Sequence, residues 1–209
     1  MTEIVVNSVQ MVCTAICSIL CARRIKETKD RSWIMLGLSS SVFFLGDLYW
    51  QLYMLFYGES PHYSYIPYVG WYACYLFLIF MLIEIRGRLS FRSGKKILWL
   101  VPLFTAVMGT FYLQWGDVFG NVISFVFMTV LIWQSVEGLL LIQEGEGDRR
   151  ENRFLYLTIL LFCIFEYAAW TASCFWSGDN INNAYYWFDA LLSVTFLLLP
   201  RALEKAVKV

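Results

Sequence analysis

Histidine is scarce in this chain, and basic residues are missing from its long apolar runs. Its 209 residues contain one histidine, His62, which lies in a polar segment. A zinc site built from several histidines and an intramembrane Ser–His catalytic pair are therefore both excluded. The last apolar run, residues 184–203, contains no lysine, which excludes a retinal Schiff base on that run.

Six cysteines are present, but no two of them form a Cys-X-X-Cys pair. Cys13, Cys17 and Cys21 are spaced four residues apart, so they share one face of a helix. Small side chains in that pattern are typical of a contact between membrane helices. The sequence therefore predicts no metal site and no cofactor.

All sixteen Lys and Arg residues fall in four short segments, 23–31, 86–96, 149–153 and 201–208. The chain is 59% hydrophobic and has a mean hydropathy of +0.59, whereas soluble domains are about 45–50% apolar. Basic residues accumulate on the cytoplasmic side of membrane proteins. If the four basic segments are cytoplasmic, the chain crosses the cell membrane seven times, with its N-terminus extracellular and its C-terminus cytoplasmic.

These runs predict an all-α, polytopic fold, because backbone groups inside lipid must be bonded within helices or a closed barrel. A span needs about 20 apolar residues, so seven spans use most of the chain and leave one transmembrane domain, 1–209, without room for an output domain. The seven expected helices cover residues 4–22, 33–57, 65–85, 97–113, 117–143, 154–176 and 184–203.

An internal repeat is suggested by a shift of the sequence by 119 residues, which places Asp47 on Glu166. The shift also gives linkers of equal length and lays the first three expected helices on the last three. We therefore expect a parallel 3+1+3 repeat of residues 1–88 and 120–207, joined by the helix 97–113.

Four carboxylates lie inside the apolar runs: Asp47, Glu137, Glu166 and Asp189. Each costs about 2.5–3.5 kcal/mol at the centre of a membrane helix, and no Lys, Arg or His in the same runs can pair with them. They cannot all be ionised in a medium of low dielectric constant, so some are neutral or a cation from outside compensates them. Glu137 lies in the inner half of the expected helix 117–143, where it would act as a relay for protons or cations.

Aromatic and polar residues share helical faces with these acids. Trp50 and Gln51 follow Asp47 by three and four residues, and Trp170 follows Glu166 by four. Carboxylates and ring faces together suit an ammonium or guanidinium group. The sequence thus predicts an outward-facing acidic and aromatic cavity whose ligand-binding residues are Asp47, Trp50, Gln51, Trp71, Tyr75, Glu166, Trp170 and Asp189.

Two structural interpretations stand beside this prediction. Trp and Tyr form belts at the interfaces of ordinary membrane proteins. Carboxylates can also be buried as neutral groups that bond to hydroxyls, amides or backbone carbonyls across helices.

The segment from Phe44 through Asp47 to Trp50, followed by 65–78 and by Arg86, resembles the N-terminal membrane modules of bacterial diguanylate cyclases and sensor kinases. The shared features are an acid-bearing helix, a short polar outer loop and an aromatic helix that ends in Arg. The resemblance covers the second and third expected helices and, loosely, the sixth and seventh. It implies a bacterial sensory role, in which a separate cytoplasmic protein would supply the output.

The pair Gly46-Asp47, together with Glu166, is also similar to the lysoplasmalogenase family, whose eight-helix hydrolases carry paired intramembrane Asp residues. Here the second acid is Glu and seven helices are expected. The 3+1+3 plan is similar to that of the SWEET and PQ-loop transporters, although this chain has no Pro-Gln signature.

Three hypotheses follow from the sequence. The first is a receptor-like or sensory module, with no catalytic residue, that binds a small cationic or amphipathic ligand. The second is a proton- or cation-coupled carrier, and the third is a lipid hydrolase in which Asp47 and Glu166 hold a water. The partners are the lipid bilayer, the small molecule and a signalling protein, but no nucleic acid, because the outer loops carry no Lys or Arg.

Overall fold

The computed structural model describes residues 2–59, 61, 65–87, 95–115, 118–145, 150–176 and 178–207. Within these ranges there is no strand, which confirms the all-α prediction. His62 and Asp117 lie outside the described residues. The helices are α1 (Thr2–Thr28), α2 (Arg31–Tyr57), α3 (Tyr65–Arg86), α4 (Leu100–Tyr112), α5 (Val118–Glu144), α6 (Arg153–Phe175) and α7 (Ala184–Val207), with short 3-10 turns η1 (Lys96–Trp99) and η2 (Arg150–Asn152) before α4 and α6.

Five of the described helices, α1, α2, α3, α5 and η2 with α6, are long and apolar enough to cross a membrane. The chain is thus a helical membrane protein. The apolar helix formed by η1 and α4 is shorter, at Lys96–Tyr112. Helix α7 is long, but it carries Asp189, Arg201 and Glu204 and is not among the five.

The turn between α1 and α2 is set by local chemistry. Lys29 has a φ of 54°, in the left-handed region. Asp30 then caps α2, since its carboxylate accepts a hydrogen bond of 2.7 Å from the backbone N–H of Ser32. At the other end of α2, Gly58 ends the helix with a φ of 75°, which a glycine adopts without strain.

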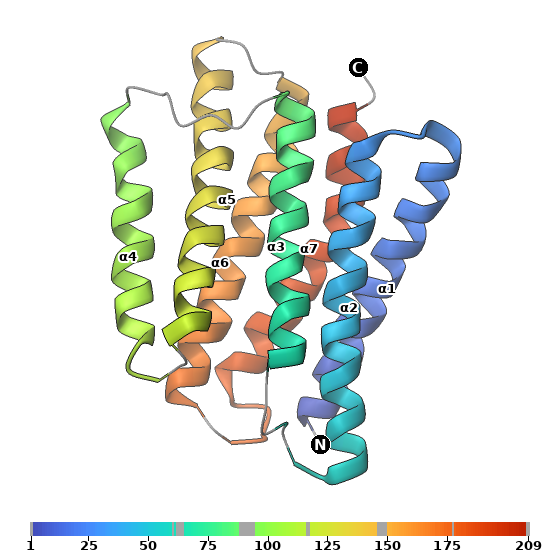
Figure 1. Cartoon of the computed structure of the whole chain (residues 1–209), viewed down its shortest axis with the longest axis vertical. Coiled ribbons are helices and arrows are strands. Elements are labelled where there is room, and N and C mark those ends of the chain that lie inside the picture. Colours follow the sequence, from blue (N-terminus) through green and yellow to red (C-terminus); the bar gives the residue numbers. More distant parts are fainter. Residues whose placement is uncertain are drawn as a thin grey trace.

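Six of the helices form a ring (Figure 1). Helix α1 packs against α2 and α7, α2 against α3, α3 against α5, α5 against α6, and α6 against α7. Helix α4 stands outside this ring and packs chiefly on α5. The ring therefore consists of two consecutive triplets, α1–α3 and α5–α7, which meet chiefly where α1 packs against α7 and where α3 packs against α5.

Small residues allow the helices to approach closely. A Cβ atom added to Gly70 of α3 would lie 2.7 Å from the backbone oxygen of Val42 and 3.3 Å from Gly46 in α2. A Cβ atom on Gly138 of α5 would collide with the ring of Tyr156 in α6. Glycine is therefore required where α2 meets α3 and where α5 meets α6.

The two ends of the bundle differ in charge. The described basic residues lie at the end where the C-terminus is found, and the N-terminus lies at the opposite end (Figure 1). At the C-terminal end, Arg24 of α1 pairs with Glu204 of α7, and Arg31 of α2 lies 3.7 Å from Glu84 of α3. The other end of the bundle carries the acidic residues described next.

Candidate functional site

Three of the predicted acids converge near the N-terminal end of the ring, one from each of α2, α6 and α7. Asp47, Glu166 and Asp189 are only 4%, 5% and 3% exposed. Asp47 lies close enough to the other two carboxylates for their charges to repel one another when ionised. The fold therefore assembles an acidic cluster from helices that are distant in sequence.

One oxygen of each acid is held by a single donor. Trp71 Nε1 donates to Asp47 Oδ1 at 3.0 Å, and Tyr75 OH donates to Glu166 Oε1 at 2.6 Å. The amide Nε2 of Gln10 donates to Asp189 Oδ1 at 2.5 Å. The second oxygens of Asp47 and Asp189, both named Oδ2, are buried and have no hydrogen-bond partner among the described residues.

A cavity of about 340 Å³, here called the acidic cavity, opens beside Asp47. Its wall combines indole rings from three helices or their ends with carboxylates and amides. The lining residues are Glu3, Asn7, Gln10, Asp47, Trp50, Tyr68, Trp71, Trp170, Ser173, Trp176, Asn183, Tyr185 and Tyr186.

A smaller cavity of about 40 Å³ continues among the acids. Glu166 and Asp189 line it together with Tyr75. Both cavities share Gln10, Trp71, Trp170 and Tyr185 in their walls. The two cavities are therefore neighbours, and the other two carboxylates lie in the wall of the smaller one.

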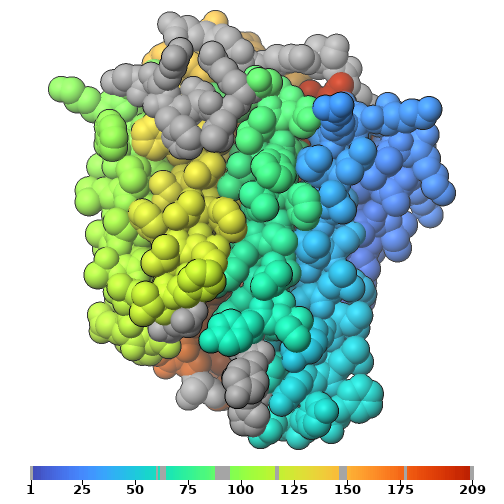
Figure 2. Space-filling model, viewed as in Figure 1, coloured from blue at the N-terminus to red at the C-terminus, as the bar shows by residue number. Residues whose placement is uncertain are grey.

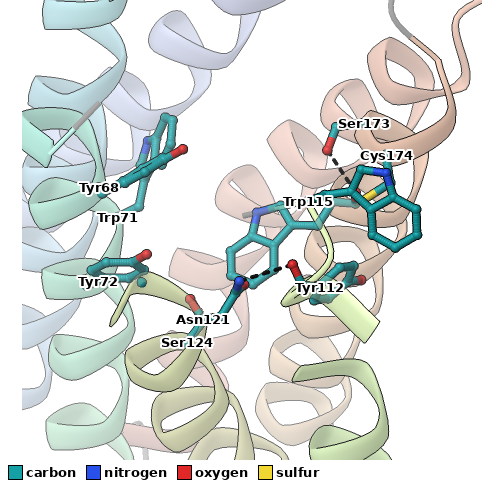
Figure 3. Close-up of a pocket in the computed structure, with 11 residues that line it drawn as sticks. Tyr68, Trp71, Tyr72, Tyr112, Trp115, Asn121, Ser124, Ser173 and Cys174 are labelled. Atoms are coloured by element: carbon teal, nitrogen blue, oxygen red, sulfur yellow. Dashed lines mark hydrogen bonds between the residues drawn. The ribbon is translucent and has the colours of Figure 1, made fainter. Parts of the chain in front are cut away.

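A third cavity, of about 200 Å³, lies between α3, α5, α6 and the end of α4 and is here called the neutral compartment. Figure 2 shows the surface hollowed between α3 and α5 towards the end where the N-terminus lies. Figure 3 shows the rings of Tyr68, Trp71 and Tyr72 on one side, facing Tyr112 and Trp115 across the space.

The structure places seven of the eight predicted ligand-binding residues in these walls. Asp47, Trp50, Trp71 and Trp170 line the acidic cavity, and Tyr75, Glu166 and Asp189 line the smaller one. Gln51 lies elsewhere: its amide donates to the Ile4 carbonyl and to Ser8 Oγ, both at 3.1 Å, so it fastens α2 to α1.

Glu137 has a different environment from the other acids. The expectation that no basic group pairs with it is wrong, because Arg86 Nη2 of α3 lies 3.1 Å from Glu137 Oε2 of α5. Both side chains are almost fully buried, at 4% and 2% exposed. The same guanidinium donates to Gln134 Oε1 at 2.6 Å. Glu137 is not among the residues that line the cavities described above.

Several residues of the site were not predicted, and Gln10 is the most important. The two amides Asn7 and Gln10, three residues apart in the first apolar run, are a signal that the sequence does contain. The rim of the acidic cavity was also missed. There the Glu3 backbone N–H donates to Asp179 Oδ1 at 2.9 Å, which joins α1 to the segment before α7. Trp50 Nε1 of α2 donates to the Glu3 side chain, at 3.2 Å from Oε1.

The described residues contain no group of three His, Cys, Asp or Glu side chains placed to hold a metal ion. No protein-family model, no curated protein and no solved structure matches this chain. The function therefore has to be inferred from the geometry of these cavities.

Proposed function

We propose that this protein is a seven-span bacterial membrane receptor or sensory module that binds a small cationic ligand in the acidic cavity. Its N-terminus would be extracellular and its C-terminus cytoplasmic, so the cavity would open outward. A separate cytoplasmic protein would carry the signal onward.

The apolar faces of α4 and α7 support seven spans. In α7, Trp187, Leu191 and Val194 are 58%, 43% and 48% exposed and follow one another at helical spacing. In α4, Leu103 and Val107 are 61% and 59% exposed. Large apolar side chains exposed along one face are expected where a helix meets lipid, so both helices suit the bilayer.

The observation that carries the proposal is the pair of unpartnered oxygens, Oδ2 of Asp47 and of Asp189. A buried polar atom without a partner costs about 1–3 kcal/mol, and more when it is charged. In each carboxylate one donor already fixes the other oxygen. A bound ammonium group would supply the missing donors and the opposite charge.

The indole rings favour the same class of ligand. Trp50 and Trp71 lie with their ring centroids 6.2 Å apart in the wall that also holds Asp47. Trp170 lines the same cavity. A cation over an indole face gains about 0.5–2 kcal/mol, most when it is desolvated. Anionic ligands are disfavoured, because Glu3 and Asp47 both line the cavity.

Calorimetry on the purified chain with a panel of amines, amino acids and carboxylates tests the proposal. We expect amines to bind and carboxylates not to bind. Asp189→Asn should weaken amine binding about tenfold or more, because it removes one charge-assisted contact. Glu84→Gln is the matched control, since Glu84 lies at the other end of the bundle. Equal affinities in all three proteins would contradict the proposal.

The topology has its own test in single-cysteine variants labelled on intact cells. Asp179→Cys lies beside the acidic cavity and should react with a membrane-impermeant maleimide. Glu144→Cys, at the C-terminal end of α5, should react only after the cells are opened. The reverse pattern would invert the topology, and the cavity would then face the cytoplasm.

A proton- or cation-coupled carrier is the second candidate, and the ring of two triplets favours it. Carriers with parallel repeats place their substrate between the two halves, and here the acids lie between α1–α3 and α5–α7. This arrangement is also the one that the 3+1+3 repeat predicts. Amine uptake into proteoliposomes that depends on a pH gradient would identify a carrier, and binding without uptake would identify a receptor.

A further inference from the structure

The neutral compartment has an unusual composition for a cavity beside three carboxylates. None of its eleven lining residues is charged, and six of them are Tyr or Trp. The lining residues are Tyr68, Trp71, Tyr72, Tyr112, Trp115, Gly120, Asn121, Ser124, Trp170, Ser173 and Cys174. A charged group placed here would have no counter-charge among the described residues of the wall.

The two compartments share one wall. Tyr68, Trp71, Trp170 and Ser173 line both the acidic cavity and the neutral compartment. Trp71 also donates to Asp47, so one indole joins the carboxylate to the aromatic space. A single molecule of modest length can therefore reach both compartments.

Several polar groups of the neutral compartment already bond within the protein. Asn121 Nδ2 donates to the Tyr112 carbonyl at 3.2 Å, and Ser173 Oγ donates to the Trp170 carbonyl at 2.7 Å (Figure 3). The Tyr112 hydroxyl lies 2.8 Å from Thr171 Oγ1. Ring faces and edges are the main surface left for a ligand, and they favour an apolar or aromatic group.

We infer that the ligand is an amphipathic amine with one ammonium group and one apolar or aromatic arm. The ammonium group lies in the acidic cavity beside Asp47, next to the smaller cavity that Asp189 lines, and the arm lies in the neutral compartment. The inference deepens the proposed function and rests on it.

Other ligand classes fit these compartments less well. A hydrophilic polyamine would place a second ammonium group among uncharged rings. An uncharged apolar ligand would leave Oδ2 of Asp47 and of Asp189 without donors. A small hydrophilic amine would fill the acidic cavity and leave about 200 Å³ of aromatic space unused.

Calorimetry with a graded series of amines tests the arm. Ethylamine, butylamine and 2-phenylethylamine carry the same ammonium group, and 2-phenylethanol carries the phenyl arm without charge. Each buried methylene should tighten binding about fourfold. We therefore expect 2-phenylethylamine to bind at least about 100-fold more tightly than ethylamine, and 2-phenylethanol not to bind.

Ser124→Phe is the decisive variant, because Ser124 is buried in the wall of the neutral compartment and lines neither of the two cavities that the carboxylates line. It should weaken 2-phenylethylamine at least tenfold and leave ethylamine unchanged. Ser124→Ala, which adds no bulk, is the matched control. Unchanged 2-phenylethylamine affinity in folded Ser124→Phe would overturn the inference.

Cys174 gives a second measurement that does not depend on the folding of that variant. It lines the neutral compartment and is half-buried, whereas the other five cysteines are buried. Bound 2-phenylethylamine should slow its reaction with a thiol reagent at least fivefold, and ethylamine should not. Cys174→Ser supplies the blank. Equal protection by both amines, or by neither, would overturn the inference.

The two proposals fail in different ways. If no amine binds, or if Asp189→Asn binds every amine as tightly as the unmodified chain, the proposed function is wrong. If ethylamine and 2-phenylethylamine bind equally and Asp189→Asn weakens both, the acidic cavity stands and the inference about the arm is wrong.

Discussion

Asp47→Asn should act in opposite directions on stability and on binding. In the unmodified protein, Trp71 Nε1 donates to Asp47 Oδ1 at 3.0 Å. An asparagine at position 47 can place its amide oxygen where Oδ1 lies and still accept this hydrogen bond. The substitution removes a buried anionic group whose second oxygen has no partner among the described residues. The ligand-free variant should therefore be as stable as the unmodified chain, or more stable by about 1–3 kcal/mol, because a buried charge without a charged partner is costly.

Binding should change the other way. A hydrogen bond to a charged group is worth about 1.5–3 kcal/mol, which corresponds to a loss of about 10- to 150-fold in amine affinity. Thermal unfolding followed by Trp fluorescence measures the first effect, and calorimetry measures the second. Trp50, Trp71 and Trp170 lie in the cavity wall, so their emission should also report occupancy.

Two controls make the result decisive. Glu84→Gln removes a carboxylate at the other end of the bundle and should leave amine affinity unchanged. Trp71→Phe removes the hydrogen-bond donor to Asp47. It should lower the stability of the ligand-free protein, whereas Asp47→Asn should leave that stability unchanged or raise it. If Asp47→Asn lowers stability and leaves affinity intact, the carboxylate is structural and the reasoning is refuted.

Two further predictions concern the framework. Glu137→Gln leaves the Arg86 guanidinium buried without its 3.1 Å carboxylate partner and should lower the free energy of unfolding by about 3–5 kcal/mol; the double variant with Arg86→Gln should recover much of that loss, and a purely additive double variant would contradict the pairing. Gly70→Ala places a Cβ atom 2.7 Å from the Val42 carbonyl oxygen and should lower the free energy of unfolding by about 1–3 kcal/mol, because α2 and α3 must move apart. Thermal unfolding measures this loss, with Ala73→Gly in the same helix as the control. An unchanged unfolding midpoint in Gly70→Ala would contradict the prediction.

The helices were predictable from the sequence because apolar runs and basic segments determine where each begins and ends. The expected segments 65–85 and 184–203 start at the same residues as α3 and α7. The largest difference is at α1, which continues to Thr28 through charged residues. Hydropathy marks where lipid ends, whereas a helix continues as long as its backbone bonds are satisfied.

The grouping of the acids was also largely predictable, but their partners were not. Asp47 and Gln51 share a face by spacing, yet α1 packs against that side of α2 and engages Gln51. Arg86 was expected at the membrane surface, but α3 packs against α5, so the guanidinium turns inward to Glu137. Both outcomes depend on which helices become neighbours, and spacing within one helix does not contain that information.

The contrast between Glu137 and the acids of the cavity is the strongest argument that the latter serve a ligand. At Glu137 the fold supplies a buried guanidinium from a neighbouring helix. At Asp47 and Asp189 it supplies one neutral donor each, which orients the carboxylate and leaves Oδ2 unpartnered among the described residues. If these acids were only structural, satisfying both oxygens would stabilise the protein. A fixed oxygen beside an unpartnered one, in the wall of a cavity, is the arrangement that a binding site for a cation requires.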